Sequence, residues 1–149
     1  MSEPSAESRP IVFTEVEQFG GAERSALALV RWLRQRGLPA HVVSYVDRCG
    51  LANYASHPLE VVELKAVGTR QRIAALRRYF NSRPSSAPRP LLSGYQPALH
   101  ATLAGIRGFH DLMHDTPSLF DDPANRSWRS KLRLAVSNRI VAAGLRSGG

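Results

Sequence analysis

Three short stretches of this 149-residue chain each follow a predicted strand, and their residue types suit them to chemistry. They are the glycine pair Gly20-Gly21, the stretch Gly94-Tyr95 and the pair His110-Asp111. Glycines at the start of a helix leave backbone N–H groups open to a phosphate, which the positive end of the helix dipole also attracts. The structural alternatives are a tight turn at the glycines and a hydrogen-bonded pair at the histidine and aspartate.

The glycine pair lies inside a predicted βαβ unit. A short apolar run at residues 11–14 precedes it, and a strand follows at residues 40–46. Gly37 is suited to the left-handed position that ends the helix between them. We predict this helix over residues 22–36, because apolar residues recur at the spacing i, i+3, i+4 and i+7, namely Ala26, Leu29, Val30 and Leu33.

The remaining chain continues to alternate between strands and helices. Further strands are predicted at residues 59–64, 91–93 and 107–109, and helices at residues 69–80, 97–103 and from about 126 onward. This alternation predicts an α/β fold with a doubly wound parallel sheet, preceded by a disordered tail at residues 1–9. Ligands of such sheets bind beyond the carboxyl ends of the strands. The three stretches are therefore expected to meet there, with His110-Asp111 at the carboxyl end of the strand 107–109.

Several kinds of site are not supported by the sequence. The glycine spacing is not G-x-G-x-x-G and no P-loop lysine follows, which argues against a dinucleotide site and a P-loop ATPase. His110, His114 and Asp115 suggest a metal site only weakly, and we expect none. Cys49 is the single cysteine, so it cannot form an internal disulfide and is expected to be an ordinary loop thiol.

The chain carries a formal net charge of +8. Six arginines and no acidic residue lie between Arg70 and Arg89. Solvated helix faces, an acidic membrane surface and nucleic acid are the three explanations for this charge. No nucleic-acid-binding motif is present, so we expect no nucleic-acid partner. Without an apolar stretch of membrane-spanning length, the expected location is the cytoplasm, with peripheral contact of the arginine-rich helices to the inner face of the membrane left open.

Two of these motifs resemble a known family. The run Gly20-Gly21-Ala22-Glu23-Arg24, with the helix and the valine-rich strand after it, is similar to the start of family 4 glycosyltransferases, which are retaining enzymes of the GT-B fold. The run Phe109-His110-Asp111-Leu112 resembles a histidine–aspartate segment at the end of a later strand in the same N-terminal domain. The resemblance implies that residues 10–149 are a Rossmann-like, acceptor-side domain whose sheet lacks its final strand.

The resemblance also implies an activity, which is transfer of a sugar from a nucleotide-diphosphate donor substrate to a glycan or lipid-linked acceptor, without a metal or other cofactor. Gly20 and Gly21 would lie beside the donor phosphates. His110 would be the catalytic residue against the donor sugar or the acceptor. The implied substrate-binding residues are Gly94, Tyr95 and Asp111.

In that family a C-terminal domain supplies most donor contacts. We therefore expect residues 1–149 alone to be inactive in transfer and to need such a domain in cis or in trans. The alternatives are a non-catalytic sugar- or phosphate-binding module of the same fold and, less favoured, a basic nucleic-acid-binding protein.

Overall fold

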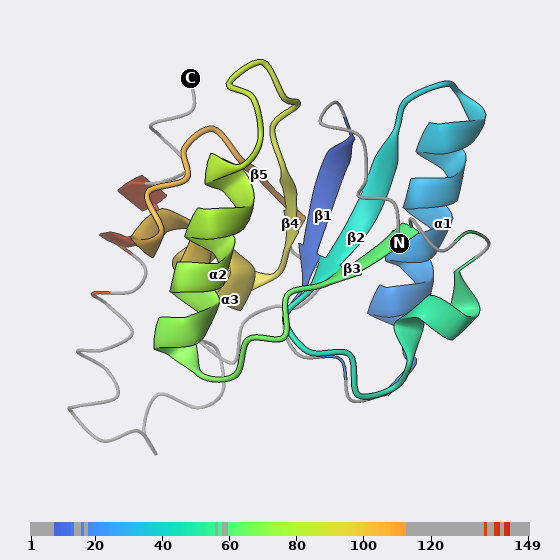
Figure 1. Ribbon diagram of the computed structural model, residues 1–149, viewed down its shortest axis with the longest axis horizontal. Helices are drawn as coiled ribbons and strands as arrows, with labels where there is room; N and C mark the ends of the chain where they lie inside the picture. The colour runs from blue at the N-terminus through green and yellow to red at the C-terminus, as the bar shows by residue number, and fades with distance from the viewer. Residues whose placement is uncertain are drawn as a thin grey trace.

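The structure, a computed structural model, describes residues 8–13, 16, 18–55, 57, 60–112, 136, 139–140 and 142–143, with only the backbone described at residues 111 and 112. It is an α/β fold in which strands and helices alternate along the chain (Figure 1). The elements in chain order are β1 (Arg9–Phe13), α1 (Gly21–Gln35), β2 (Ala40–Ser44), the 3-10 helix η1 (Leu51–Tyr54), β3 (Val61–Glu63), α2 (Thr69–Asn81), β4 (Leu91–Ser93), α3 (Tyr95–Leu103) and β5 (His110–Leu112).

The described strands form one sheet with the order β3-β2-β1-β4-β5. Each neighbouring pair is parallel. The chain adds β2 and β3 on one side of β1 and then returns to add β4 and β5 on the other side. The order of the strands therefore reverses at β1, an arrangement compatible with a Rossmann-like fold.

Helices cover both faces of the sheet, with α1 on one side and α2 and α3 on the other (Figure 1). Successive residues of a strand point to opposite faces, so one strand contributes to both layers. Ile11 packs in the cluster beneath α1, whereas Val12 packs in the cluster beneath α2 and α3. All five residues of β2 are buried, which explains why its valines show no polar alternation.

Most predicted elements are confirmed, and one is wrong. The predicted helix 22–36 matches α1 to within one residue at each end, and the strand 91–93 matches β4. The strand predicted at residues 107–109 is instead a connection, and β5 begins at His110. Gly108 has a φ of 69°, a left-handed value that an extended strand does not contain. Pairing with β4 starts only beyond it, where the His110 amide donates to the Pro90 carbonyl at 3.0 Å.

The predicted disordered tail also ends earlier than expected. Ser8 is only 4% exposed, and β1 begins at Arg9, so the predicted boundary after residue 9 is corrected. Residues 1–7 lie outside the described residues. The helix predicted from about residue 126 is described only at residues 136, 139–140 and 142–143, which are helical.

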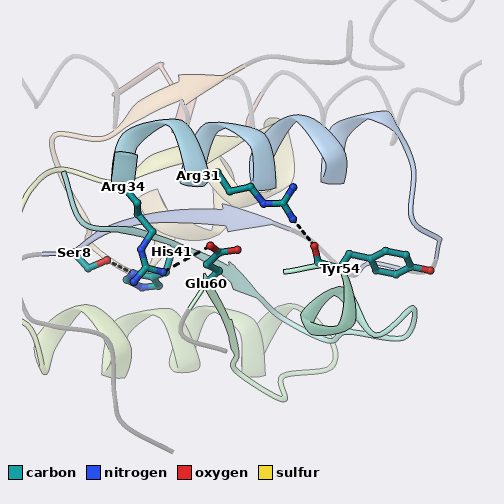
Figure 2. A network of polar contacts seen from close by, with 6 residues as sticks. All are labelled: Ser8, Arg31, Arg34, His41, Tyr54 and Glu60. Atoms are coloured by element: carbon teal, nitrogen blue, oxygen red, sulfur yellow. Dashed lines mark hydrogen bonds and ion pairs between the residues drawn. The ribbon is translucent and has the colours of Figure 1, made fainter. Parts of the chain in front are cut away.

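A buried polar network explains why Ser8 belongs to the folded part. His41 of β2 has no exposed surface. Its Nδ1 lies 2.5 Å from Ser8 Oγ, and its Nε2 lies 2.5 Å from the Tyr79 hydroxyl. Arg83 donates to the same hydroxyl at 3.4 Å and also to the Ser8 carbonyl. Figure 2 shows Ser8 and His41 beside the ion pair between Arg34 and Glu60, whose closest atoms are 4.0 Å apart.

This environment keeps His41 neutral. Burial, with added repulsion from Arg83 and Arg34, lowers the pKa of His41 from 6.5 to about 4. Burial and Arg72 lower the pKa of His100 from 6.5 to about 4 as well. Between these values the unfolded chain binds more protons than the folded chain, so the free energy of unfolding falls as the pH falls.

The fold should therefore lose stability between pH 6.5 and pH 4. The His41 contribution is on the order of 2–3 kcal/mol across that window, because one pKa unit corresponds to about 1.4 kcal/mol. Urea unfolding of the wild type and of His41→Gln at several pH values measures this pH dependence of the free energy of unfolding. His41→Gln, which cannot titrate, should flatten the pH dependence by roughly half, with His100 supplying the remainder. His110→Ala, at an exposed position, is the control. A His41→Gln profile parallel to that of the wild type would contradict this account.

Candidate functional site

The strand order places a candidate site between the carboxyl ends of β1 and β4. The chain leaves β1 toward α1 on one face of the sheet, and it leaves β4 toward α3 on the other face (Figure 1). In doubly wound sheets, connections that diverge in this way flank the crevice in which ligands bind, and the crevice expected here lies between the starts of α1 and α3. The structure thus brings the starts of α1 and α3, with Gly20-Gly21 and Gly94-Tyr95, to the same edge of the sheet.

The start of α1 offers backbone amides to this crevice. The first intrahelical bond runs from the Arg24 amide to the Gly20 carbonyl at 3.2 Å, so the amides of Gly21, Ala22 and Glu23 have no acceptor within the helix. The Gly20 amide is already engaged, because it donates to Glu23 Oε2 at 2.9 Å. Glu23 thus caps the helix with its own carboxylate, while the amides of Gly21, Ala22 and Glu23 have no acceptor in the part of the chain that the structure describes.

Neither glycine of this pair is required by the backbone conformation. Gly20 is extended, with a φ of −107°, and Gly21 is the first residue of the helix. A Cβ on Gly21 would meet no atom within 4 Å, whereas a Cβ on Gly20 would lie 3.1 Å from Glu23 Oε2. Residue 21 could therefore carry a side chain without strain or clash. A glycine at such a position is expected where a ligand approaches the backbone closely.

The start of α3 is built differently. Gly94 has a φ of 95° and a ψ of 167°, a region that is almost exclusive to glycine. The first bond of α3 runs from the Ala98 amide to the Gly94 carbonyl at 3.4 Å, and Pro97 has no amide hydrogen. The amides of Tyr95 and Gln96 are the ones that remain. Gly94 is thus a structural glycine, which turns the chain directly from β4 into α3.

Three buried polar atoms lie in the layer formed by α2 and α3. Tyr45 Oη, Tyr95 Oη and His100 Nδ1 are inaccessible and have no hydrogen-bond partner among the described residues. The rings of Tyr45 and His100 are in edge contact, with centroids 5.5 Å apart, and the Arg72 guanidinium lies 5.2 Å from the Tyr45 centroid. Burial raises the pKa of Tyr45, so this hydroxyl stays protonated.

Sequence reasoning placed Tyr95 in the site but missed Tyr45 and treated His100 as an ordinary residue. The signal for His100 was its position on the buried face of α3, three residues after Pro97 and next to Ala101. Tyr45 directly follows the last residue of β2, as ligand-facing residues of parallel sheets do. Both features are visible in the sequence once the strand ends are known.

His110 does not lie where the sequence predicted. It is the first residue of β5, level with Leu91 at the start of β4, and not at a carboxyl end. The end of β4 at Ser93 lies two residues further along, a distance of about 7 Å. The His110 side chain is exposed, and Asp111 is level with Leu92. The structure therefore does not bring His110 together with the two glycine turns, and its expected catalytic role loses the strand-end position on which it rested.

The remaining candidates carry little reactivity. The Cys49 thiol lies 3.6 Å from Asp47 Oδ1, and burial together with that carboxylate raises the pKa of Cys49, which favours the unreactive thiol form. No group of three side chains suited to a metal ion occurs among the described residues, and His114 and Asp115 lie outside them.

None of the helices in the described part of the chain has the length and apolar character needed to cross a membrane.

Comparison of the chain with family models, with curated proteins and with solved structures gave no match. The geometry of the crevice is therefore the evidence on which a function is proposed.

The two kinds of glycine should respond differently to alanine. Gly94→Ala forces a strained backbone and should lower the free energy of unfolding by about 1–3 kcal/mol. Gly21→Ala has open space and a helical conformation, and should leave the stability unchanged or raise it by up to about 1 kcal/mol. Urea titration of both variants beside the wild type measures the contrast. Equal destabilisation by the two variants would show that Gly21 is a structural glycine after all.

Proposed function

We propose that residues 10–149 are the N-terminal, acceptor-side half of a retaining family 4 glycosyltransferase of the GT-B type. In this proposal the chain helps to transfer a sugar from a nucleotide-diphosphate donor to a glycan or lipid-linked acceptor. One observation carries the proposal: two helices begin at the strand-order reversal, and the first presents amides that have no acceptor among the described residues, beside a glycine that the fold does not require.

The chemistry follows from those amides. Transfer of a sugar from a nucleotide diphosphate leaves a diphosphate that must be stabilised as the bond to the sugar breaks. Fixed N–H groups at a helix start stabilise such developing charge without a metal and without reorganisation. In the proposed complex, Gly21 allows the phosphate to approach the start of α1, with Gly20 beside it. Gly94 and Tyr95, at the start of α3, remain the proposed substrate-binding residues, whereas Asp111, level with Leu92 within β4, does not share their strand-end position.

A second half-site is part of the proposal. Glu23 adds a negative charge at the start of α1, and the two nearby cations already pack on aromatic rings, Arg24 over Phe19 and Arg72 over Tyr45. The cations needed to neutralise a diphosphate would come from a C-terminal domain, in cis or in trans. Residues 1–149 alone are thus proposed to bind diphosphates weakly and to transfer no sugar.

Diphosphate binding tests this function. Calorimetric titration of the 149-residue chain with pyrophosphate and with uridine diphosphate should show weak, saturable binding. Gly21→Val should reduce the affinity by about tenfold or more, equivalent to ~1.4 kcal/mol, because the branched side chain fills the approach to the amides. Ala28→Val, at an exposed position of the same helix, is the matched control for stability and for binding.

Three outcomes would contradict the proposal in different ways. No binding of either diphosphate, or equal binding by Gly21→Val, would remove the phosphate site. Sugar transfer by the 149-residue chain alone would remove the need for a second half. Diphosphate binding by a complete protein that transfers no sugar with any added partner would favour the non-catalytic binding module.

A second proposal concerns where the enzyme works. No acidic residue occurs from Lys65 to His110, a stretch that includes α2, β4 and α3, whereas one lysine and seven arginines do. Lys65, Arg70, Arg78 and Arg107 are exposed. Arg77 is used within the fold, where it donates to the carbonyls of Leu103 and Ala104 at the end of α3. We propose that the layer of α2 and α3 contacts an anionic membrane surface, beside a lipid-linked acceptor.

Vesicle binding tests this contact. The chain should co-sediment with vesicles that contain phosphatidylglycerol and not with phosphatidylcholine vesicles, and added salt should weaken the binding. Replacing Arg70 and Arg78 together by Glu should remove at least half of the bound fraction, because each basic residue near the surface contributes about 1 kcal/mol to membrane binding. Arg36→Glu, at the residue that directly follows α1 in the opposite layer, should have a smaller effect. Stronger binding to arbitrary RNA than to these vesicles would instead favour a nucleic-acid partner.

A further inference from the structure

The exposed aromatic ring of Tyr54 lies beside the start of α1. Tyr54 is 46% exposed, although tyrosine is a large and partly apolar residue. Its ring lies face to face with the ring of Phe19, with centroids 3.9 Å apart and an angle of 5° between the planes. Phe19 directly precedes Gly20, so the pair of stacked rings borders the turn that opens α1.

The ring is held in place from several sides. Arg31 of α1 donates to the Tyr54 carbonyl at 2.6 Å, as Figure 2 shows, and the Tyr54 ring points away from that contact toward the N-terminal end of the helix. Leu51, at the other end of η1, is fully buried. Phe19 packs against the core cluster beneath α1, and the Arg24 guanidinium lies over the Phe19 ring at 5.5 Å from the centroid.

The loops that carry these two rings are joined at the carboxyl edge of the sheet. Val16, beyond β1, pairs in parallel with Asp47, beyond β2. The Val16 amide donates to the Val46 carbonyl at 3.1 Å, and the Arg48 amide donates to the Val16 carbonyl at 2.9 Å. The 3-10 helix with Tyr54 is therefore fixed beside the β1–α1 connection.

We propose that the open face of Tyr54 is a stacking platform for a sugar ring, next to the phosphate position at the start of α1. Phe19 covers one face of Tyr54, and the exposed surface leaves the other face for a ligand. A rigid exposed aromatic ring gives contact area at little cost in conformational entropy, because its position is set before the ligand arrives.

One open aromatic face suits a sugar. A pyranose has one face of apolar C–H groups, which can lie on the ring, and a rim of hydroxyls that remain hydrated. A nucleobase can also stack on a single aromatic face, so uridine is the competing ligand in the test. This inference rests on the proposed function for the phosphate that anchors the sugar, while contact between the platform and a sugar is measurable without any phosphate.

Saturation-transfer NMR with methyl α-D-glucopyranoside and methyl α-D-mannopyranoside tests the platform directly. The wild-type chain should transfer saturation to the C–H protons of at least one glycoside. Tyr54→Ala should reduce the transfer by roughly fivefold, because the aromatic contact is lost. Tyr54→Phe keeps the ring and should retain the signal. Tyr54→Gln, which also lacks a ring, should behave like Tyr54→Ala.

Trp32 provides a matched control for nonspecific aromatic contact. It is 47% exposed and lies on α1 near its other end, where the Arg36 guanidinium lies 3.8 Å from its ring centroid. Trp32→Ala should leave the glycoside signal unchanged. An absent wild-type signal, an unchanged signal in Tyr54→Ala, or a signal from uridine and from neither glycoside would overturn the platform.

The same samples separate this inference from the proposed function. Pyrophosphate binding that depends on Gly21, without glycoside contact at Tyr54, would overturn the platform and leave the phosphate site. Glycoside contact at Tyr54 without pyrophosphate binding would support the platform and overturn the phosphate site.

Discussion

The parallel pairing of β1 with both of its neighbours is the constraint on which the rest of the structure depends. β1 bonds to β2 on one side and to β4 on the other. Ile11 and Val12 are fully buried on opposite faces, so this one strand anchors both hydrophobic layers. Because all the pairs are parallel, the connections to the helices emerge at one edge of the sheet. Because the strand order reverses at β1, the connections to α1 and α3 diverge, and this is the position at which doubly wound sheets bind ligands.

The two ends of the sheet use buried polar groups in different ways. At the amino end, both ring nitrogens of His41 have partners, and the network joins Ser8 to α2. Toward the carboxyl end, Tyr45 and His100 are just as buried but keep polar atoms without partners among the described residues. Buried polar groups in folded proteins are nearly always paired. The pairing of His41 serves stability, whereas Tyr45 and His100 keep unused hydrogen-bonding atoms toward the end of the sheet at which doubly wound folds bind ligands.

The sequence predicted best those elements whose pattern is local. The apolar spacing in α1 and the glycine after it were sufficient to place that helix. β5 was misplaced because the short run at residues 107–109 looks extended, and only the backbone reveals the left-handed φ of Gly108. The partners of His41 come from Ser8 and Tyr79, 33 and 38 residues away, so no local pattern predicts them. The stacking of Phe19 on Tyr54 has the same cause, because it depends on how two loops meet.

In the proposed enzyme, Glu23 would leave a phosphate site at α1 incomplete without a second domain. Its carboxylate accepts a hydrogen bond from the Gly20 amide, and it lies in the first turn of α1, which a diphosphate would approach. Two unit charges of the same sign at 4 Å repel by roughly 4 kcal/mol at an effective dielectric constant of about 20. The amides of Gly21, Ala22 and Glu23, with the exposed cation Arg24 of the same turn, would have to overcome that repulsion. In the proposed enzyme, cations from a facing domain would offset the charge of Glu23 and of the diphosphate together, so that strong binding and catalysis would arise only when the crevice is closed from both sides.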